Sequence, residues 1–176
     1  MSDQQVIELS AFVDRVVTSC EKVQLSEVDP YGHLNASRYA EYLINHRFSA
    51  VEDQLKVSTI GLLRSTGIAF VVTRLDIRYL RPCFLGEVIE TGSWVVSLEE
   101  MGFSLNLVMS SESNKKVRAH AQMDCRSIVA ATGKSVAMPT KFPTRATPDI
   151  VFSRPLSADY LSGLLDVPSS MSTPRA

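Results

Sequence analysis

Hydrophobic and polar residues alternate with a period of two over most of the middle of the chain. Four stretches follow this pattern: 68–79, 86–99, 103–110 and 117–126. Such alternation predicts strands of an antiparallel sheet with one covered face and one polar face. The joins after Glu99 and near Ser113 and Asn114 are short, as hairpins require. The region therefore predicts a meander of about four strands.

The segment before this region holds one further strand and then a break. Residues 16–28 are rich in β-branched side chains and alternate, which predicts a strand. Asp29, Pro30 and Gly32 then interrupt the pattern, because Pro and Gly two positions apart are typical of a turn. Residues 29–35 are therefore expected to form a loop at the end of the strand.

A helical pattern follows this loop. From Ala36 to about Leu55 the chain contains neither Gly nor Pro, and its apolar residues recur at helical spacing over a wide face. Asn35 or Ser37 is expected to cap the helix, since either side chain can accept a hydrogen bond from a free N–H group. A Gly-containing connection over 61–67 is then expected to lead into the sheet.

Together these elements predict a single α+β domain in which an antiparallel β-sheet wraps around one long central α-helix. This arrangement buries an apolar helix and one apolar sheet face at the same time. The domain is expected over 1–139, of which roughly the first 14 residues are flanking. Six of the eight prolines fall between 139 and 176, so 140–176 is expected to be a Pro-rich C-terminal extension with a short helical turn at 158–165.

Charge and composition argue against several classes of protein. A formal net charge of -1 gives no attraction to nucleic acid or to an anionic membrane, so neither is expected as a partner. Three widely spaced cysteines favour neither a disulfide framework nor a zinc site, and no metal is expected. The first residues lack the pattern of a secretory signal, so the cytoplasm is the expected location.

Asp29 carries the candidate chemistry of the loop. It precedes a helix N-terminus, where free N–H groups and a partial positive charge of about half a unit can stabilise an oxyanion. A carboxylate at this place can attack a carbonyl carbon directly or deprotonate a water as a general base, and both modes remain open. Asp-Pro-x-Gly is also a common β-turn, in which the Asp caps its own turn.

Three motifs in register resemble one known family. Asp29-Pro-Tyr-Gly-His-Leu-Asn35, followed by Tyr39, resembles the D-x-x-G-H-[VL]-N…Y signature of the 4-hydroxybenzoyl-CoA thioesterase-like family. The stretches 70–72, 77–79, 82–83 and 86–87 are similar to its strand–Tyr–Pro–Gly–acid run. Residues 132–139 are similar to its closing T-G-K-x-x-x-x-P. The resemblance covers roughly 16–139.

This resemblance implies a hot-dog fold and hydrolysis of an acyl-CoA thioester to free acid and CoA, with no cofactor, because CoA is part of the substrate. It implies a homodimer formed by joining two sheets edge to edge, or a homotetramer, with the active site between subunits. By matching position, Asp29 takes the catalytic carboxylate role, and His33 and Asn35 orient the loop or the substrate. Backbone N–H groups near Asn35 and Ala36 hold the thioester oxygen.

Further residues are expected to contact the substrate. Those of the loop and helix start are Tyr31, Gly32, Ala36 and Ser37. Phe70 and Val71, on the strand expected beside the helix start, are candidates for lining the acyl channel, although core packing explains them equally well.

The chain also departs from the family pattern at two places. Many relatives have a second Asn where this chain has Ala36, and many carry acids on the helix near Ile44 and Asn45, where this chain has none. The second departure leaves Asp29 as the candidate acid of the loop and helix.

Other polar residues receive structural interpretations. His46 and Cys83 are expected to be packed in the interior, and His120 to be exposed. Lys115, Lys116 and Arg118 form a basic cluster that is expected at a solvated hairpin tip, or as a contact for CoA phosphates.

Two alternatives to an acyl-CoA thioesterase stay open. One is a thioesterase that acts on an acyl-carrier protein. The other is a non-catalytic hot-dog module that binds acyl-CoA or serves as a scaffold, because a fold does not settle a function.

Overall fold

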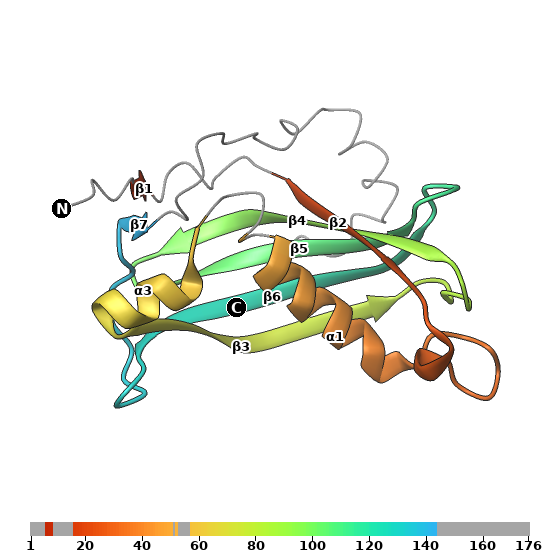
Figure 1. The fold of residues 1–176 in the computed structure, drawn as a ribbon, viewed down its shortest axis with the longest axis horizontal. Coiled ribbons are helices and arrows are strands. Elements are labelled where there is room, and N and C mark those ends of the chain that lie inside the picture. Colours follow the sequence, from red (N-terminus) through yellow and green to blue (C-terminus); the bar gives the residue numbers. More distant parts are fainter. Residues whose placement is uncertain (1–5, 9–15, 51, 53–56, 144–176) are drawn as a thin grey trace, which may run out of the picture.

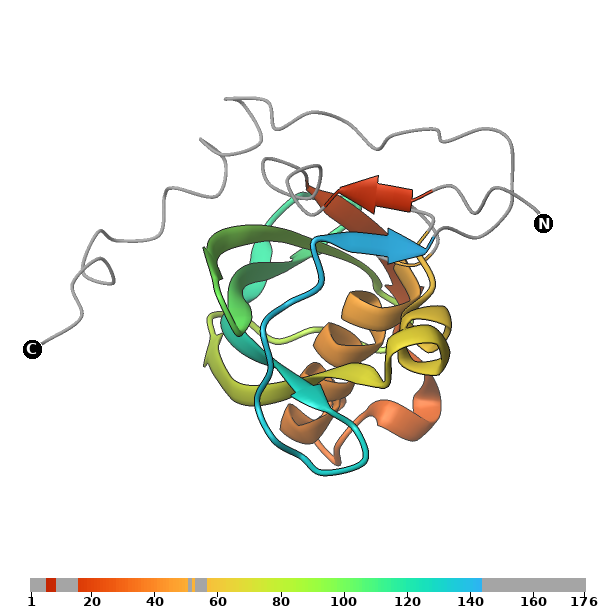
Figure 2. The same ribbon diagram turned by 90° about the vertical axis from the view of Figure 1, so that its left-hand side faces the viewer.

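A five-stranded antiparallel sheet curves around one helix in the computed structural model, which describes residues 6–8, 16–50, 52 and 57–143 (Figures 1 and 2). The helix is α1 (Ala36–Asn45). The strands are β2 (Val17–Lys22), β3 (Ile68–Tyr79), β4 (Val88–Glu99), β5 (Gly102–Ser111) and β6 (Val117–Val129). Short strands β1 (Val6–Glu8) and β7 (Lys141–Pro143) pair with each other as a separate sheet.

The strand order is β2-β4-β5-β6-β3, so the predicted meander is correct only for β4, β5 and β6. Both predicted hairpins, β4–β5 and β5–β6, are confirmed. Strand β3, however, pairs with β6 instead of β4 and lies at the edge of the sheet. Segment 80–87 therefore has to pass β6 and β5 before β4 begins, which no local pattern in the sequence indicates.

Helix α1 begins where the sequence predicts, and Asn35 is its cap. The Asn35 side chain accepts from the Ser37 N–H (3.0 Å) and from the Ser37 hydroxyl (2.9 Å), which decides between the two candidates. The α-helix then widens into a π-helix, η3 (His46–Ala50). The α-helical part is therefore shorter than the predicted 36–55, whose last residues lie outside the described part of the chain.

Residues 61–67 are not a simple connection, and that prediction was wrong. They belong to helix α3 (Thr59–Thr66), whose start is capped by the Ser58 hydroxyl, which accepts from the Gly61 N–H at 2.9 Å. The helix ends at Gly67 in the left-handed conformation (φ 70°), the ordinary role of a Gly at this position. Burial of Leu62 holds the helix against the domain.

The predicted first strand also needs correction, because β2 ends at Lys22. The chain then enters a short 3₁₀ helix, η2 (Leu25–Glu27), instead of continuing as a strand to Val28. This early turn places the following loop beside the start of α1 (Figure 1).

The core lies between α1 and the concave face of the sheet. Leu43 of α1 and Ile89, Leu107, Met109 and Met123 of the sheet are almost completely buried. On β6 the apolar positions are buried at every second residue, as the alternation predicts. Residues 144–176, which hold most of the predicted extension and its helical turn, lie outside the described residues.

Candidate active site

The loop 29–35 is a tight turn closed by the Asp29 carboxylate. Asp29 Oδ1 accepts from the backbone N–H groups of Tyr31 (2.9 Å) and His33 (3.1 Å). The Asp29 N–H donates to the His33 carbonyl (2.8 Å), and Gly32, at φ 78°, donates to the Asp29 carbonyl (3.0 Å). Asp29 therefore does cap its own turn, but with one oxygen. Among the described residues, Oδ2 has no hydrogen-bond partner.

Three neighbouring segments fix this turn in place. The Asn35 N–H donates to the Glu27 carbonyl of η2 (2.9 Å), and the Glu27 carboxylate accepts from the Tyr42 hydroxyl of α1 (2.8 Å). On the other side, the Leu34 N–H donates to the Cys83 carbonyl (2.8 Å). The His33 ring meets the Phe84 ring edge-on at 5.2 Å. Segment 80–87, which the unexpected strand order requires, thus forms one wall of the loop.

The start of α1 presents a free donor beside this loop. The Ala36 N–H has no acceptor within the part of the chain that the structure describes, because the Asn35 side chain serves Ser37 instead. The Ala36 carbonyl accepts from the Tyr79 hydroxyl at 3.2 Å, which ties the helix start to the end of β3. The geometry therefore offers one backbone N–H at the positive end of a helix, available to a ligand oxygen.

The structure brings together seven of the nine predicted site residues, those numbered between 29 and 37. Tyr31 is 84% exposed, and Ala36 and Ser37 are also exposed, whereas Asp29 and His33 are half-buried. Phe70 and Val71 lie elsewhere. Strand β3 runs so that its end, Tyr79, and not its beginning, lies beside the helix start. Phe70 lines a pocket beyond the far end of α1, and Val71 is 36% exposed between two inward-facing neighbours.

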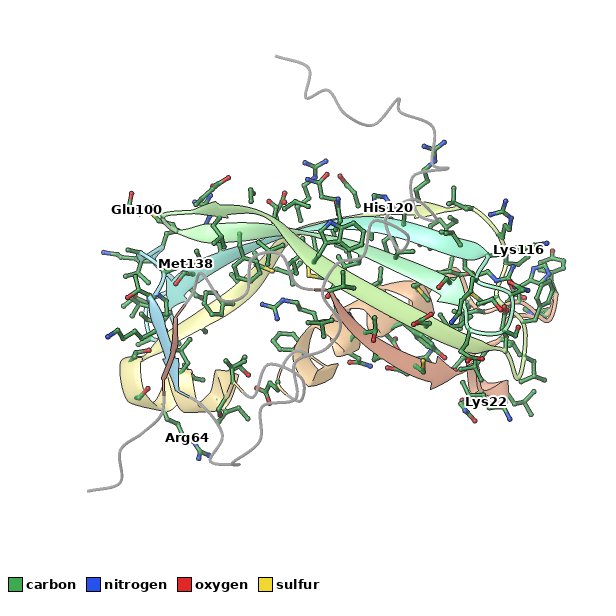
Figure 3. The ribbon with its side chains drawn as sticks, turned by 90° about the horizontal axis from the view of Figure 1, so that it is seen from above. Lys22, Arg64, Glu100, Lys116, His120 and Met138 are labelled. Carbon is green, nitrogen blue, oxygen red and sulfur yellow. The ribbon has the colours of Figure 1, made fainter. Side chains whose placement is uncertain are left out.

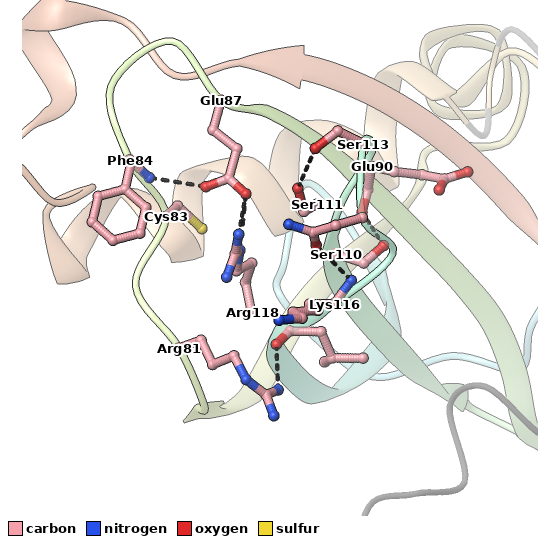
Figure 4. Close-up of polar contacts among 12 residues, drawn as sticks. Arg81, Cys83, Phe84, Glu87, Glu90, Ser110, Ser111, Ser113, Lys116 and Arg118 are labelled. Atoms are coloured by element: carbon pink, nitrogen blue, oxygen red, sulfur yellow. Dashed lines mark hydrogen bonds and ion pairs between the residues drawn. The ribbon is translucent and has the colours of Figure 1, made fainter.

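The three residues of the predicted basic cluster differ in their surroundings, because two of them form ion pairs with separate glutamates. Figure 4 shows the pair of Arg118 with Glu87. Arg118 is largely buried, and its Nε donates to Glu87 Oε1 at 2.9 Å. Burial alone would raise the pKa of Glu87, but hydrogen bonds from Arg118, Ser111 and the Phe84 N–H outweigh it and hold that pKa below its usual range. Lys115 pairs with Glu90 (2.9 Å), while Lys116 remains exposed at the β5–β6 hairpin (Figure 3).

The structural interpretations of His46 and Cys83 are confirmed. Both are fully buried. His46 Nδ1 lies 2.7 Å from the Ser19 hydroxyl and Nε2 lies 2.9 Å from the Ser93 hydroxyl, and burial lowers its pKa to about 4. Burial also raises the pKa of the Cys83 thiol to about 11, which makes a reactive thiolate unfavourable at neutral pH. His120 is half-buried and not fully exposed as expected.

Metal ligands do not gather in the described segments, since no three His, Cys, Asp or Glu side chains there are grouped as a metal site requires. None of the helices in the same segments is both long enough and apolar enough to cross a membrane.

Comparison with known proteins identifies the family. The model of the thioesterase-like superfamily matches residues 23–146, which include the loop, α1 and the whole sheet from β3 to β6. The chain belongs to this superfamily. The resemblance read from the loop and strand motifs is thereby confirmed, and the chain is a thioester hydrolase.

Individual relatives agree with this assignment. The long-chain acyl-CoA thioesterase FadM of Escherichia coli is 29% identical over 117 residues, which are 66% of this chain and 86% of that protein. The crystal structure of YbaW, a probable thioesterase from Escherichia coli, superposes with a TM-score of 0.61 at 29% identity, over 69% of this chain and 89% of YbaW. A 1,4-dihydroxy-2-naphthoyl-CoA thioesterase from Synechocystis shares the fold, with a TM-score of 0.64 at 15% identity over 70% of this chain and 90% of that one.

One residue that sequence reasoning missed is Arg47. It lies four positions after the buried Leu43, on the same face of the helix, and it lines the pocket that also contains Phe70. The spacing alone indicated an inward-facing arginine, but a charged residue at a core position is easily taken as an exposed one.

Proposed function

We propose that the protein hydrolyses an acyl-CoA thioester to a free carboxylic acid and CoA, with the thioester carbonyl placed between Asp29 and the start of α1. The observation that carries this proposal is the divided use of the Asp29 carboxylate. Oδ1 is held by two backbone N–H groups, which orient the carboxylate, while Oδ2 is without a partner among the described residues. An oriented carboxylate with a free oxygen is what a general base or a nucleophile requires.

Asp29 can act in either of two modes, and both lead to a free carboxylic acid and CoA. As a general base, Asp29 takes a proton from water, the water oxygen bonds to the carbonyl carbon, and the C–S bond breaks as the CoA sulfur leaves and receives the proton. As a nucleophile, the carboxylate itself displaces the CoA thiolate, and water then hydrolyses the resulting anhydride. In both modes the negative charge that develops on the carbonyl oxygen is stabilised by the Ala36 N–H and the N-terminus of α1.

Other residues of the loop support these two groups. His33 holds the Asp29 side chain through its backbone N–H and packs on Phe84, so we assign it a positioning role. Asn35 keeps the Ser37 N–H engaged and thereby leaves the Ala36 N–H to the substrate. Exposed Tyr31, with Gly32 and Ser37, forms the surface that CoA would meet.

We also propose a homodimer that joins two copies along β3. This strand is 12 residues long and has a strand neighbour on one side only among the described strands. A long open edge is unfavourable in a monomer because its backbone groups pair readily with another chain. Exposed Val71 and Tyr79 belong to this strand and would lie at the interface. Sedimentation of the purified protein tests this, and a monomer at micromolar concentration contradicts it.

Substitution of Asp29 tests the mechanism. Asp29→Ala should lower kcat for a good acyl-CoA by at least about 100-fold, as loss of a general base or nucleophile does, while the far-ultraviolet circular dichroism spectrum stays unchanged. Glu99→Ala, which removes an exposed carboxylate at the β4–β5 hairpin, away from β3, is the control and should retain full activity. A loss below about tenfold for Asp29→Ala would exclude Asp29 from the chemical step.

A substrate screen tests the proposed class. Short, medium, long and aromatic acyl-CoAs should be compared with the same acyl groups on an acyl-carrier protein. Cleavage of at least one CoA thioester is expected. Cleavage of carrier-protein thioesters alone would replace the proposal with the alternative.

A further inference from the structure

A cavity of about 170 Å³ lies beyond the far end of α1. Its walls come from η3, α3, the beginning of β3 and the middle of β6. Most lining side chains are apolar, and they include Phe48, Leu62, Leu63, Phe70 and Val72. A dry apolar cavity of about 150 Å³ is large enough to hold a benzene-sized group. The cavity therefore fits the end of an organic ligand.

Arg47 is the single charged residue among those that line this cavity. Its Nε is fully buried and has no hydrogen-bond partner. The guanidinium lies over the Phe103 ring, 4.9 Å from the ring centre, and takes part in none of the ion pairs of the described residues. Its polar neighbour is Cys125, whose thiol is a weak acceptor.

Glu52 is the described acidic residue nearest to Arg47 in the sequence, and its carboxylate already accepts hydrogen bonds from another residue. The Glu52 carboxylate accepts from the Thr59 N–H at 2.9 Å and also from the Thr59 hydroxyl. Burial lowers the pKa of Arg47, because no described carboxylate compensates for the lost contact with water. A buried charge is costly unless it is paired, so a ligand that brings an acceptor to Arg47 would be bound with unusual preference.

A strip of partly buried apolar side chains runs along β3 from this cavity toward the candidate active site. Phe70, Val72, Leu75 and Ile77 face inward along β3 and are partly buried, whereas Ala121 and Met123 of neighbouring β6 are completely covered. The strip ends at Tyr79, which is hydrogen-bonded to Ala36. Since a helix rises about 1.5 Å per residue, Arg47 lies roughly 15 Å from Ala36 along α1.

We propose that this protein selects acyl groups that carry a carboxylate at the end remote from the thioester, and that Arg47 binds this carboxylate. The inference rests on the proposed acyl-CoA hydrolysis and adds the class of acyl group. With the thioester carbonyl at Ala36, the chain of the acyl group lies along the β3 strip and its far end enters the cavity. A guanidinium binds a carboxylate with two parallel hydrogen bonds, and the apolar walls accommodate the methylene groups next to it.

Matched pairs of CoA thioesters test the inference. Octanoyl-, dodecanoyl- and hexadecanoyl-CoA are each compared with the dicarboxylic counterpart of the same length. For the length that spans the strip, the dicarboxylic substrate should have a kcat/KM at least about tenfold higher, because a buried donor left without an acceptor disfavours the plain chain. A shorter dicarboxylic chain should lose this preference, since its carboxylate would stop on the apolar strip.

Arg47→Met keeps the length of the side chain and removes its charge. It should abolish the preference, so that kcat/KM for the dicarboxylic substrate falls at least about tenfold relative to kcat/KM for the plain chain of the same length. Arg64→Met, the same change on the exposed side of α3, should alter neither value. If the wild-type enzyme cleaves both members of every pair equally well and Arg47→Met changes neither, the inference is overturned while the proposed function stands.

A binding measurement separates the two proposals. Free dodecanoic acid should raise the Tm of the wild-type protein more than the uncharged 1-dodecanol does, and this difference should vanish in Arg47→Met. If no CoA thioester is cleaved, the proposed function fails, but this difference in Tm would still support a carboxylate site at Arg47. Equal Tm values with the acid and the alcohol would overturn it. If Arg47→Met does not fold, the comparison of the acid and the alcohol on the wild-type protein decides alone.

Discussion

Two arginines of the described residues are withdrawn from solvent, Arg118 almost completely and Arg47 in part, and they differ in what lies beside them. Arg118 reaches across from β6 to the Glu87 carboxylate and binds it with two nitrogen atoms. Arg47 reaches from η3 into an apolar cavity, and its Nε meets no acceptor. The protein thus supplies a carboxylate partner for the guanidinium of Arg118, whereas none of the described residues supplies one for Arg47.

The difference shows where the fold supplies a partner for a buried charge. Glu87 also accepts from the Phe84 N–H, so the pair at Arg118 fastens segment 80–87, which forms one wall of the loop 29–35. Its role is structural and requires nothing from outside. At Arg47 the equivalent carboxylate is missing among the described residues, which is the arrangement expected where a substrate brings it. Substitutions at these two places should therefore have opposite effects on stability.

The largest effect is expected when Arg118 is replaced. Arg118→Met leaves Glu87 without its charged partner, and removal of one member of a buried pair typically lowers the free energy of unfolding by about 3–5 kcal/mol. Urea unfolding followed by circular dichroism measures it. Arg126→Met, on the exposed face of the same strand, serves as the control. Equal stability of Arg118→Met and the wild-type protein would remove the distinction between the two arginines.

The second largest effect is expected in the pH dependence of stability, through His46, which is next to Arg47 in the sequence. Its folded pKa of about 4 lies below the usual value of 6.5, so the unfolded chain binds the proton more readily. The contribution of His46 to the free energy of unfolding is fully present above about pH 6.5. It declines by roughly 3 kcal/mol as the pH falls toward 4. Urea titrations across this range should show the decline, and His46→Gln should flatten it. An unchanged slope in His46→Gln would assign the decline to other groups.

A smaller effect of opposite sign is expected at Arg47. Arg47→Met replaces an incomplete buried charge with an apolar side chain of similar length, and such replacements often stabilise a protein by about 1–2 kcal/mol. The Tm in the absence of ligand should therefore rise. A fall as large as that for Arg118→Met would indicate that Arg47 has a structural role after all.

The smallest effect belongs to the exposed start of α1. Asn35→Ala removes the cap on the Ser37 N–H and should cost about 1 kcal/mol in unfolding free energy. Asn35→Asp keeps an acceptor at the same place and should restore the stability. Thermal unfolding of both variants measures the difference, and an equal loss in both would contradict the capping role. In contrast to Arg47, the Asn35 side chain has hydrogen-bond partners within the protein, and in contrast to Arg118 it is exposed to solvent.

The sequence predicted well those features that depend on nearby residues. The Asp29–Asn35 turn, the helix start at Ala36 and the inward-facing positions of β6 follow from local turn chemistry, capping and alternation. The candidate site at 29–35 could therefore be located, although the Asp29 Oδ2 and Ala36 N–H, both without a partner among the described residues, became visible only in the structure.

The features that the sequence missed depend on contacts between distant segments. The pairing of β3 with β6 determines that Tyr79, and not Phe70, lies beside Ala36. Helix α3 depends on burial of Leu62, which overcomes the unfavourable helix propensity of Gly61. Arg47 has the spacing of an inward-facing residue, but its charge favours exposure, and the fold decides between the two.

Strand β3 uses its two sides for different purposes. Its inner face carries the apolar strip between Ala36 and the cavity, while its outer edge is open to another chain. A bulge between Val72 and Arg74 already shifts the register in the middle of the strand. An inserted or deleted residue there would exchange inner and outer positions over half of the strand at once. In an evolving family, a single change in the length of this strand would therefore alter the apolar strip and the open edge together.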